Sequence, residues 1–356
     1  METNDNLRAR IENLDRELVL MLERRAELVK QNAGADPDLK REVSRHLLAA
    51  RVDDLVRGAN GVFPEDGLRR VFTEILSWCG TLEEPCEVAF LGPEGTFSHQ
   101  AALAAFGSGV KFVPLHRVDD IFGAVEKRNA HHGIVAIENS TGGVVHDVLD
   151  RFLMSDVRIT SELVLYIRHC LISRLPLEQI RRVFSHPQPF MQCRTWLRAH
   201  LPNVTLIEVS STVEGVRRAA ESGDGAAIGS DLAARLNGMD ILAANIQDQS
   251  DNFTRFVTLG RKLPEPTGSD KTSLILSIKH QPGSLFDALK PFRDRGVNLS
   301  KIESRPSRQR PWEYVFFIDF EGHVAEESVR ELLQDLERNT LFVRFLGSYP
   351  RARAII

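Results

Sequence analysis

The sequence predicts a multidomain protein that joins an all-α helical domain, a two-lobed α/β domain and a ferredoxin-like βαββαβ domain. Three patterns predict this order: apolar residues spaced by three and four near the N-terminus, short apolar strands that alternate with helical patterns in the middle, and a βαββαβ pattern at the C-terminal end. The predicted domains are residues 1–84, 85–262 and 271–356. The length of 356 residues fits about two to three domains.

Composition excludes several classes of partner. The 45 basic and 49 acidic residues give a net charge of -4, so no overall field favours nucleic acid or an anionic membrane surface. No run reaches the roughly 20 apolar residues that span a bilayer, and the polar start Met1–Asn6 lacks a secretory pattern, so we expect a cytoplasmic protein. The four cysteines match no zinc or redox spacing, and we expect neither a metal nor another cofactor.

The helical domain begins with an amphipathic stretch. Its apolar positions fit one long helix over residues 7–32, and they are Leu7, Ile11, Leu14, Leu18, Leu22 and Leu28. Gly34 and Pro37 are expected to end this helix, because glycine supports a C-terminal cap and proline disfavours helix in the residue before it. Two further helices are expected over residues 39–58 and 67–82.

The middle domain alternates short apolar runs with helical patterns. Strands are expected over residues 88–91, 133–137 and 226–229. Alternation of this kind predicts a largely parallel α/β arrangement, in which ligands bind beyond the carboxyl ends of the strands. The length of the domain allows two lobes with a cleft between them.

A linker precedes the third domain. Residues Leu263–Asp270 are rich in proline, glycine and polar residues, which favours a linker there. The strands expected after it cover residues 272–278, 297–304, 314–320 and 341–347, and the helices cover 284–295 and 325–338.

Loops that follow the middle strands carry candidate anion-binding groups. In Gly92–Gln100 a strand gives way to a glycine-bearing loop and then to a helix capped by Thr96 or Ser98, which would aim free N–H groups at an anion. Glu138–Gly143 follows another strand and offers hydroxyls and glycines. An ordinary turn explains either segment as well.

Two further segments begin helices. Ser211–Glu214 has the spacing of a capping box, and a helix start also binds carboxylates. His186–Pro189 could hold a catalytic histidine, but a turn before a helix over residues 190–200 explains the segment as well.

The segment Ile246–Phe256 is the strongest candidate for a binding site. It gathers short hydrogen-bonding side chains around one arginine between two predicted strands, and Thr254 and Arg255 are expected to emerge together where the second strand begins. The chain lacks the G-x-S-x-G, GxxxxGK[ST] and GxGxxG motifs of hydrolases, P-loop enzymes and dinucleotide enzymes. These features favour a site that holds a carboxylate over classical acid–base chemistry.

Four spaced motifs together resemble the prephenate dehydratase family, and they are Gly92–Gln100, Ile137–Thr141, His186–Cys193 and Asn252–Phe256. The resemblance implies a two-lobed fold like that of periplasmic binding proteins, and conversion of prephenate to phenylpyruvate with loss of carbon dioxide and the ring hydroxyl. It implies that Thr254 donates or relays a proton to the leaving hydroxide. The implied catalytic residues are Thr254, Arg255, Asn139 and Ser140, and the implied substrate-binding residues are Glu94, Thr96, Thr141, Ser211, Thr212, Asn252 and Phe256.

The C-terminal domain resembles an ACT regulatory domain. Pro282–Leu285 and Asn298–Pro306 look like its effector-binding loops, which implies L-phenylalanine as an effector gripped between two subunits. The implied effector-binding residues are Gly283, Ser284, Leu285, Glu303, Ser304 and Arg305. A plain turn and an edge strand with solvated charges is the alternative.

The N-terminal helix resembles that of a chorismate mutase domain. Arg8 and Arg25 match arginines of that family, whereas Asp36 stands where the family carries a lysine that contacts the ether oxygen and a carboxylate. Three interpretations stay open: a mutase active on chorismate, a degenerate mutase that serves assembly or control, and an unrelated helical hairpin.

The resemblance also implies a homodimer or homotetramer whose partners are small molecules. Two alternatives to prephenate dehydratase stay open. One is an arogenate dehydratase, whose substrate carries an amino group in place of the keto group. The other is a non-catalytic, two-lobed sensor of an aromatic metabolite.

Overall fold

The computed structural model describes residues 4–32, 52, 55–56, 61–82, 85–306 and 314–352. The chain divides into two compact units, the first formed by residues 1–87 with 105–111 and the second by 88–104 with 112–356. Gly34, Asp36 and Pro37, and most of the helix expected over residues 39–58, lie outside the described residues. No helix in the described part of the chain is long and apolar enough to cross a membrane.

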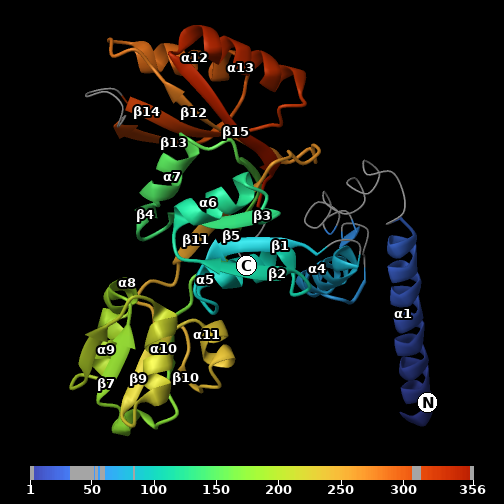
Figure 1. Cartoon of the computed structure of the whole chain (residues 1–356), viewed down its shortest axis with the longest axis vertical. Coiled ribbons are helices and arrows are strands. Elements are labelled where there is room, and N and C mark those ends of the chain that lie inside the picture. The colour runs from blue at the N-terminus through green and yellow to red at the C-terminus, as the bar shows by residue number, and fades with distance from the viewer. Residues whose placement is uncertain are drawn as a thin grey trace. The chain divides into compact units, whose positions relative to one another are not determined.

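Among its described residues, the first unit contains two long helices, α1 (Asn4–Asn32) and α4 (Glu65–Thr81), both labelled in Figure 1. They confirm the helices predicted from residues 7 and 67 onward. The apolar positions of α1 are exposed, and the largest of them are Leu7, Ile11, Leu14, Leu18, Leu20, Met21, Leu22 and Leu28. Helix α4 is tied to residues 105–111 of its own unit, because Glu74 accepts hydrogen bonds from the backbone N–H and the hydroxyl of Ser108.

The first lobe of the second unit is a sheet of six strands in the order β2-β1-β3-β11-β5, with β4 paired to β3. The strands are β1 (Glu87–Leu91), β2 (Lys111–Leu115), β3 (His132–Asn139), β4 (Gly143–Val144), β5 (Arg158–Tyr166) and β11 (Phe253–Gly260). Its helices are α5 (Phe97–Phe106), α6 (Val118–Glu126) and α7 (His146–Phe152).

The second lobe is a five-stranded sheet in the order β10-β6-β9-β7-β8. The strands are β6 (Cys170–Ile172), β7 (Arg182–Ser185), β8 (Thr205–Glu208), β9 (Gly225–Gly229) and β10 (Ile241–Ala243). The helices are α8 (Pro187–Gln192), α9 (Arg194–His200), α10 (Thr212–Glu221), α11 (Asp231–Leu236) and the 3-10 turn Leu177–Gln179. The single helix expected over residues 190–200 is therefore wrong, since the chain leaves helical geometry at Cys193.

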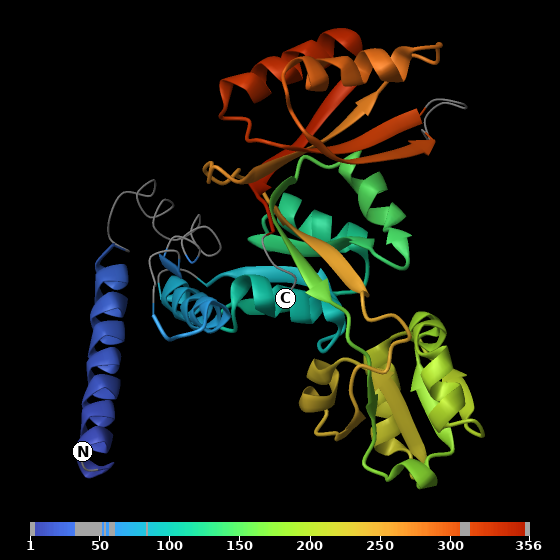
Figure 2. The ribbon, with the colours of Figure 1, turned by 180° about the vertical axis from the view of Figure 1, so that it is seen from behind.

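Both sheets are mixed, so the expectation of a largely parallel arrangement is wrong. Strands β1 and β3 pair in parallel, as β7 does with β8 and with β9, but β11 runs antiparallel to both of its neighbours. The reason is the path of the chain. It leaves the first lobe after β5, builds the second lobe, and returns to insert β11 between β3 and β5 (Figure 2).

The two connections between the lobes run beside each other. The backbone N–H of Ile167, after β5, donates to the carbonyl of Asn252 at 2.8 Å, and that of Ile246 donates to the carbonyl of His169 at 3.0 Å. The segment Ile246–Phe256 therefore forms the return connection and the first residues of β11.

The C-terminal domain confirms the predicted βαββαβ order. Its elements are β12 (Asp270–Ser277), α12 (Ser284–Asp294), β13 (Leu299–Pro306), β14 (Tyr314–Glu321), α13 (Glu327–Asn339) and β15 (Phe342–Pro350). The antiparallel sheet has the order β13-β14-β12-β15, and α12 and α13 cover one of its faces (Figure 2). Residues of the other face, such as Phe317 and Tyr349, share a core with Val257 of β11 and with α6 and α7.

Candidate active site

Asn139 and Thr254 form a hydrogen-bonded pair across the centre of the first sheet. The antiparallel register of β3 and β11 places Thr254 opposite Asn139. The amide Nδ2 of Asn139 donates to Thr254 Oγ1 at 2.8 Å and to Asn252 Oδ1 at 3.0 Å. Thr254 is 7% exposed and Asn252 is 1% exposed, so solvent competes little for these bonds.

The other end of the Asn139 amide is also fully used. Its Oδ1 accepts from the hydroxyl of Thr141 at 2.7 Å and from the backbone N–H groups of Thr141 and Gly142 at 3.1 and 2.7 Å. Because only one orientation of the amide satisfies these donors and acceptors, the side chain is fixed. The turn after β3 therefore acts to orient Asn139 toward Thr254.

The second lobe extends this network. Gln192, at the end of α8, donates from Nε2 to the hydroxyl of Thr141 at 2.8 Å, and its Oε1 lies 2.8 Å from His169 Nε2. The result is a continuous hydrogen-bonded chain from Thr254 to His169. Sequence reasoning missed two members of this chain: Gln192 lay inside the His186–Cys193 motif without being singled out, and no local signal marked His169.

His169 is a neutral member of this network. It is 1% exposed, and burial lowers its pKa although the hydrogen bond with Gln192 opposes the shift. Since the Gln192 oxygen is an acceptor, the proton of the neutral ring is on Nε2. The ring Nδ1 and the Nδ2 of Asn252 are buried without a hydrogen-bond partner among the described residues.

The loop Gly92–Gln100 is built differently from the expectation. Thr96 caps α5, since its hydroxyl accepts from the backbone N–H of His99 at 3.3 Å. Gly95 has a φ of +92°, its N–H donates to His99 Nδ1 at 3.0 Å, and its carbonyl accepts from Ser230 at 2.7 Å. The Gly95 N–H is therefore already used, and Glu94 is exposed. The loop docks on the start of α11 rather than presenting a row of free donors.

The capping role expected for Ser211 is confirmed. Its hydroxyl accepts from the backbone N–H of Glu214 at 3.1 Å, while the Glu214 carboxylate accepts from Arg218 at 2.9 Å instead of bonding back to Ser211. Thr212 is the first residue of α10. His186 caps α8, as its ring accepts from the Gln188 N–H at 3.4 Å, which confirms the turn.

Ser140 fastens the return connection. Its hydroxyl donates to the carbonyl of Asp251 at 2.9 Å and accepts from the backbone N–H of Phe253 at 3.0 Å. Asp248, in the same connection, accepts from the backbone N–H of Thr195 at 3.0 Å and so binds the start of α9. Ser140 and Asp248 thus anchor the return connection to the turn after β3 and to the start of α9.

The expectation that Arg255 emerges beside Thr254 is corrected by the strand geometry. Neighbouring residues of a strand point to opposite faces, and the Arg255 guanidinium contacts Glu162 at 2.7 Å and Asp319 at 2.6 Å. Burial opposes the charge, but Tyr349, Asp319 and Glu162 together raise the pKa of Arg255. Phe256 is 2% exposed and belongs to the protein interior.

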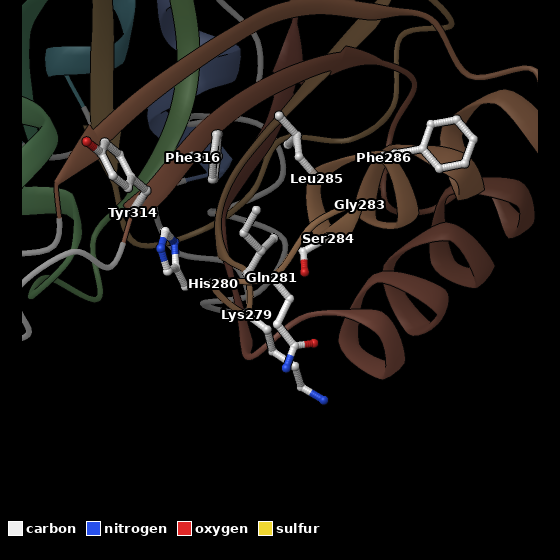
Figure 3. Close-up of a pocket in the computed structure, with 10 residues that line it drawn as sticks. Lys279, His280, Gln281, Gly283, Ser284, Leu285, Phe286, Tyr314 and Phe316 are labelled. Carbon is white, nitrogen blue, oxygen red and sulfur yellow. The ribbon is translucent and has the colours of Figure 1, made fainter.

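The C-terminal domain holds a cavity of about 350 Å³ at the start of α12. Gly283, Ser284 and Leu285 line it together with Phe286, Tyr314 and Phe316, which are labelled in Figure 3. Gly283 has a φ of +85°, which favours glycine. Three of the six expected effector residues are therefore gathered in one place.

The other three expected effector residues lie on β13 and do not line this cavity. Arg305 is used elsewhere: it donates to the carbonyl of His146 at 2.6 Å and pairs with Asp150 at 2.8 Å. Arg305 therefore contacts α7 within this chain. Glu303 is half-buried and Ser304 exposed on the same strand.

The two arginines expected in a mutase site lie on α1. Arg8 pairs with Glu12 at 3.2 Å, and its side chain is 82% exposed. Arg25 Nη1 is buried without a hydrogen-bond partner among the described residues.

Comparison with known proteins identifies the family. The family model for prephenate dehydratase matches residues 88–264, and the model for the ACT domain matches residues 272–338. A bifunctional chorismate mutase/prephenate dehydratase from Aquifex aeolicus is 42% identical over 362 residues, which cover 99% of each chain. The chain belongs to the prephenate dehydratase family. The aligned length includes α1 and α4, which argues against an unrelated helical hairpin.

Two further members of the prephenate dehydratase family bear on substrate and effector. An arogenate dehydratase/prephenate dehydratase 2 from Arabidopsis thaliana is 38% identical over 74% of this chain and 72% of its own. The crystal structure of a prephenate dehydratase from Arthrobacter aurescens in complex with L-Phe has a TM-score of 0.69 and 37% identity, and the match covers 75% of this chain and 90% of that one.

The chemistry available at the Asn139–Thr254 pair is that of neutral hydrogen-bonding groups. Cys170 and Cys193 are buried in the second lobe, and burial raises the pKa of both thiols, that of Cys193 to about 12. In the described part of the chain no group of three or more histidine, cysteine, aspartate or glutamate side chains is placed to hold a metal ion. The site offers oriented hydroxyls and amides.

Acidification is expected to destabilise the protein through His99 and His169. Burial lowers the pKa of both imidazoles below the ordinary value of 6.5. The unfolded chain therefore takes up protons that the folded chain does not. The contribution of these two histidines to the free energy of unfolding is fully present above pH 6.5. It is lost progressively as the pH falls below that value. Urea unfolding at about pH 7.5, 6.5 and 5.5 measures the change through the midpoint.

Single variants separate the contribution of His169 from that of the other histidines. His169→Gln should flatten the fall in unfolding midpoint below pH 6.5, whereas His116→Gln, which alters an exposed histidine, should leave it unchanged. Identical pH profiles for His169→Gln and the unaltered protein would contradict the expectation.

Proposed function

We propose that the protein converts prephenate to phenylpyruvate in phenylalanine biosynthesis, with Thr254 as the residue that meets the departing hydroxyl. The observation that supports this assignment is the Asn139–Thr254 pair. Because Thr254 Oγ1 accepts a hydrogen bond from Asn139, its own proton is free to be donated to another oxygen. Asn139 holds the hydroxyl in one orientation.

The reaction balances with this arrangement. The bond between the ring and its carboxylate breaks, and its electron pair enters the ring as carbon dioxide leaves. The ring hydroxyl departs with a proton as water, and the ring becomes aromatic. A threonine hydroxyl is a very weak acid, so its contribution is a hydrogen bond that strengthens as negative charge develops on the leaving oxygen. Aromatisation supplies the driving force.

The remaining polar groups are proposed as the walls of the substrate site. Thr141 and Gln192 are linked to Thr254 through Asn139. Asn252 adds a buried amide whose Nδ2 has no partner among the described residues. Ser211 and Thr212 begin α10, where backbone N–H groups favour carboxylates.

Thr254→Ala is expected to lower kcat by about 10² or more with little change in KM, because the hydroxyl acts mainly in the transition state. Phenylpyruvate formation followed by ultraviolet absorbance measures both constants. Thr254→Ser keeps the hydroxyl and is the matched control, which should retain most of the activity. Near-normal turnover by Thr254→Ala would contradict the role proposed for the Thr254 hydroxyl.

Arogenate is the competing substrate, since a relative carries both activities in its name. Parallel assays with prephenate and arogenate give the ratio of kcat/KM for the two substrates, and the proposal requires that prephenate be preferred. Turnover of neither substrate, together with binding of an aromatic metabolite, would favour a non-catalytic sensor.

L-phenylalanine is proposed as the effector of the ACT domain, bound in the cavity at the start of α12. A cavity of about 350 Å³, lined by Leu285, Tyr314 and Phe316 on one hand and by polar residues such as Gln281 and Ser284 on the other, suits one amino acid with an aromatic side chain. Glu303 and Ser304 do not line it within one chain, which fits a site completed by a second copy. Regulation requires that phenylalanine bind more tightly to the less active form.

Ser284→Phe narrows the cavity and is expected to weaken phenylalanine binding by about 10-fold or more, because a bulky ring occupies the space of the ligand. Isothermal calorimetry of the full chain measures the affinity. Lys290→Phe introduces the same residue at an exposed position of the same helix and should leave the affinity unchanged. Undiminished binding by Ser284→Phe would place the site elsewhere.

Chorismate mutase activity is the second candidate function. The relatives named for both activities span the N-terminal segment, but Asp36 replaces the expected lysine, and loss of one such donor typically costs about 10² to 10³ in rate. We propose that the segment is a weakened mutase. Asp36→Lys should raise chorismate consumption by about 10-fold or more. Asp38→Lys brings the same charge change at a different position and should have no effect.

A homo-oligomer in the cytoplasm completes the proposal. The exposed apolar positions of α1 favour burial against another copy. A monomer by sedimentation equilibrium would exclude this part of the proposal.

A further inference from the structure

Glu138 and Arg255 lie directly behind the Asn139–Thr254 pair. Strands β3 and β11 pair Thr254 with Asn139 and Arg255 with Glu138. Adjacent residues of a strand point to opposite faces of the sheet. Glu138 and Arg255 therefore form a second cross-strand pair, back to back with the first.

Both residues of this second pair are charged, and each is bound by the ACT domain. Lys301 of β13 contacts Glu138 with 2.5 Å between Nζ and Oε2. The Lys301 side chain is 17% exposed and that of Glu138 is 39% exposed, so this ion pair is partly shielded from solvent.

Arg255 is held more tightly. Its Nη1 donates to Asp319 Oδ2 at 2.6 Å, its Nη2 to the Tyr349 hydroxyl at 3.0 Å, and its Nε to Glu162 Oε2 at 2.7 Å. All three nitrogen atoms are engaged, two of them by the ACT strands β14 and β15. The side chains of Arg255, Glu162 and Asp319 are at most 10% exposed.

The partners of Arg255 are themselves fixed by ACT residues. Ser273 of β12 donates to Asp319 Oδ1 at 2.5 Å and lies 2.5 Å from the Tyr349 hydroxyl. Lys271 of the same strand pairs with Glu162 at 2.8 Å. The position of Arg255 therefore depends on three ACT strands at once.

We propose that the ACT domain positions Asn139 and Thr254 through contacts on the opposite face of the sheet. Lys301 binds Glu138, and Asp319 and Tyr349 bind Arg255. This assigns Arg255 as a positioning residue and not as a ligand of a substrate carboxylate. The inference rests on the proposed dehydratase function, because Asn139 and Thr254 are the groups being positioned.

The same contacts give a ligand of the ACT domain a route to the pair. Tyr314 and Phe316, which line the cavity, lie on β14, and Asp319 follows them on that strand. A ligand that shifts β14 therefore shifts the carboxylate that holds Arg255. The positions of β14 with and without a bound ligand would then give Thr254 two different orientations.

Variants on the ACT side test this without touching the substrate site. Asp319→Asn and Lys301→Met are each expected to lower kcat for prephenate by about 10-fold or more, since a small misplacement of a reacting group is costly, while KM stays within about threefold. Both should also weaken inhibition by L-phenylalanine. Arg344→Met is the control: it removes an ACT contact to Ser155 and Asp156 that is not behind the pair, and kcat should be unchanged.

Arg255→Lys and the double variant Arg255→Lys/Asp319→Asn separate the two roles of Arg255. A positioning role predicts a fall in kcat at constant KM, and a double variant no slower than the slower single one, because the two residues act as one unit. A carboxylate ligand predicts a large rise in KM for Arg255→Lys and unaltered kinetics for Asp319→Asn. Circular dichroism establishes that each variant is folded.

The outcomes distinguish the inference from the function on which it rests. An unaltered protein that does not turn over prephenate removes the proposed function and the inference with it. An active unaltered protein, with Asp319→Asn and Lys301→Met variants that match it in kcat and in phenylalanine sensitivity, overturns the inference alone.

Discussion

The insertion of β11 between β3 and β5 is the constraint on which the rest of the structure depends. The strand closes the first sheet only after the second lobe has been built, so one element fixes the two connections between the lobes and the centre of the sheet. It also carries Thr254 on one face and Arg255 on the other. The paired register with β3 then places Asn139 beside Thr254 and Glu138 beside Arg255.

A β-bulge lies directly beside the two cross-strand pairs. The register between β11 and β3 shifts directly after Arg255, so that Phe256 pairs with Ala136 and Ile137 is the extra residue. Bulges twist a strand locally and re-aim side chains, and they occur often beside active sites. Here the bulge interrupts the regular pairing directly beside the two back-to-back pairs.

The neutral character of the site fits the proposed reaction. Loss of carbon dioxide supplies the electron pair and aromatisation the driving force, so the protein needs to provide orientation and a hydrogen bond instead of a strong base. Burial keeps His169 uncharged, and amide groups link it to Thr254. An amide such as Asn139 has one donating and one accepting end, so a chain of amides and hydroxyls fixes the direction of each bond.

Much of the fold was predictable because its signals are local. Apolar runs bounded by glycine and proline marked the strands, and the linker and βαββαβ order followed from the same signals. The antiparallel entry of β11 was not predictable, since it depends on a return from the second lobe. The direction of Arg255 was available from strand alternation alone. The link between Gln192 and His169 was not, because the two residues are brought together by the packing of the second lobe.

The charge balance behind the Asn139–Thr254 pair explains what such a cluster contributes. Arg255 and Lys271 face Glu162 and Asp319, so two positive and two negative charges are buried together with no net charge. Desolvation offsets most of the attraction within a buried ion pair, and its main contribution is a defined geometry rather than stability. A cluster of this kind therefore contributes little to the stability of the contact between the ACT sheet and β11. Because it tolerates few alternative arrangements, it converts a displacement of the ACT strands into a displacement of Arg255, and the neighbouring Thr254 moves with the same backbone.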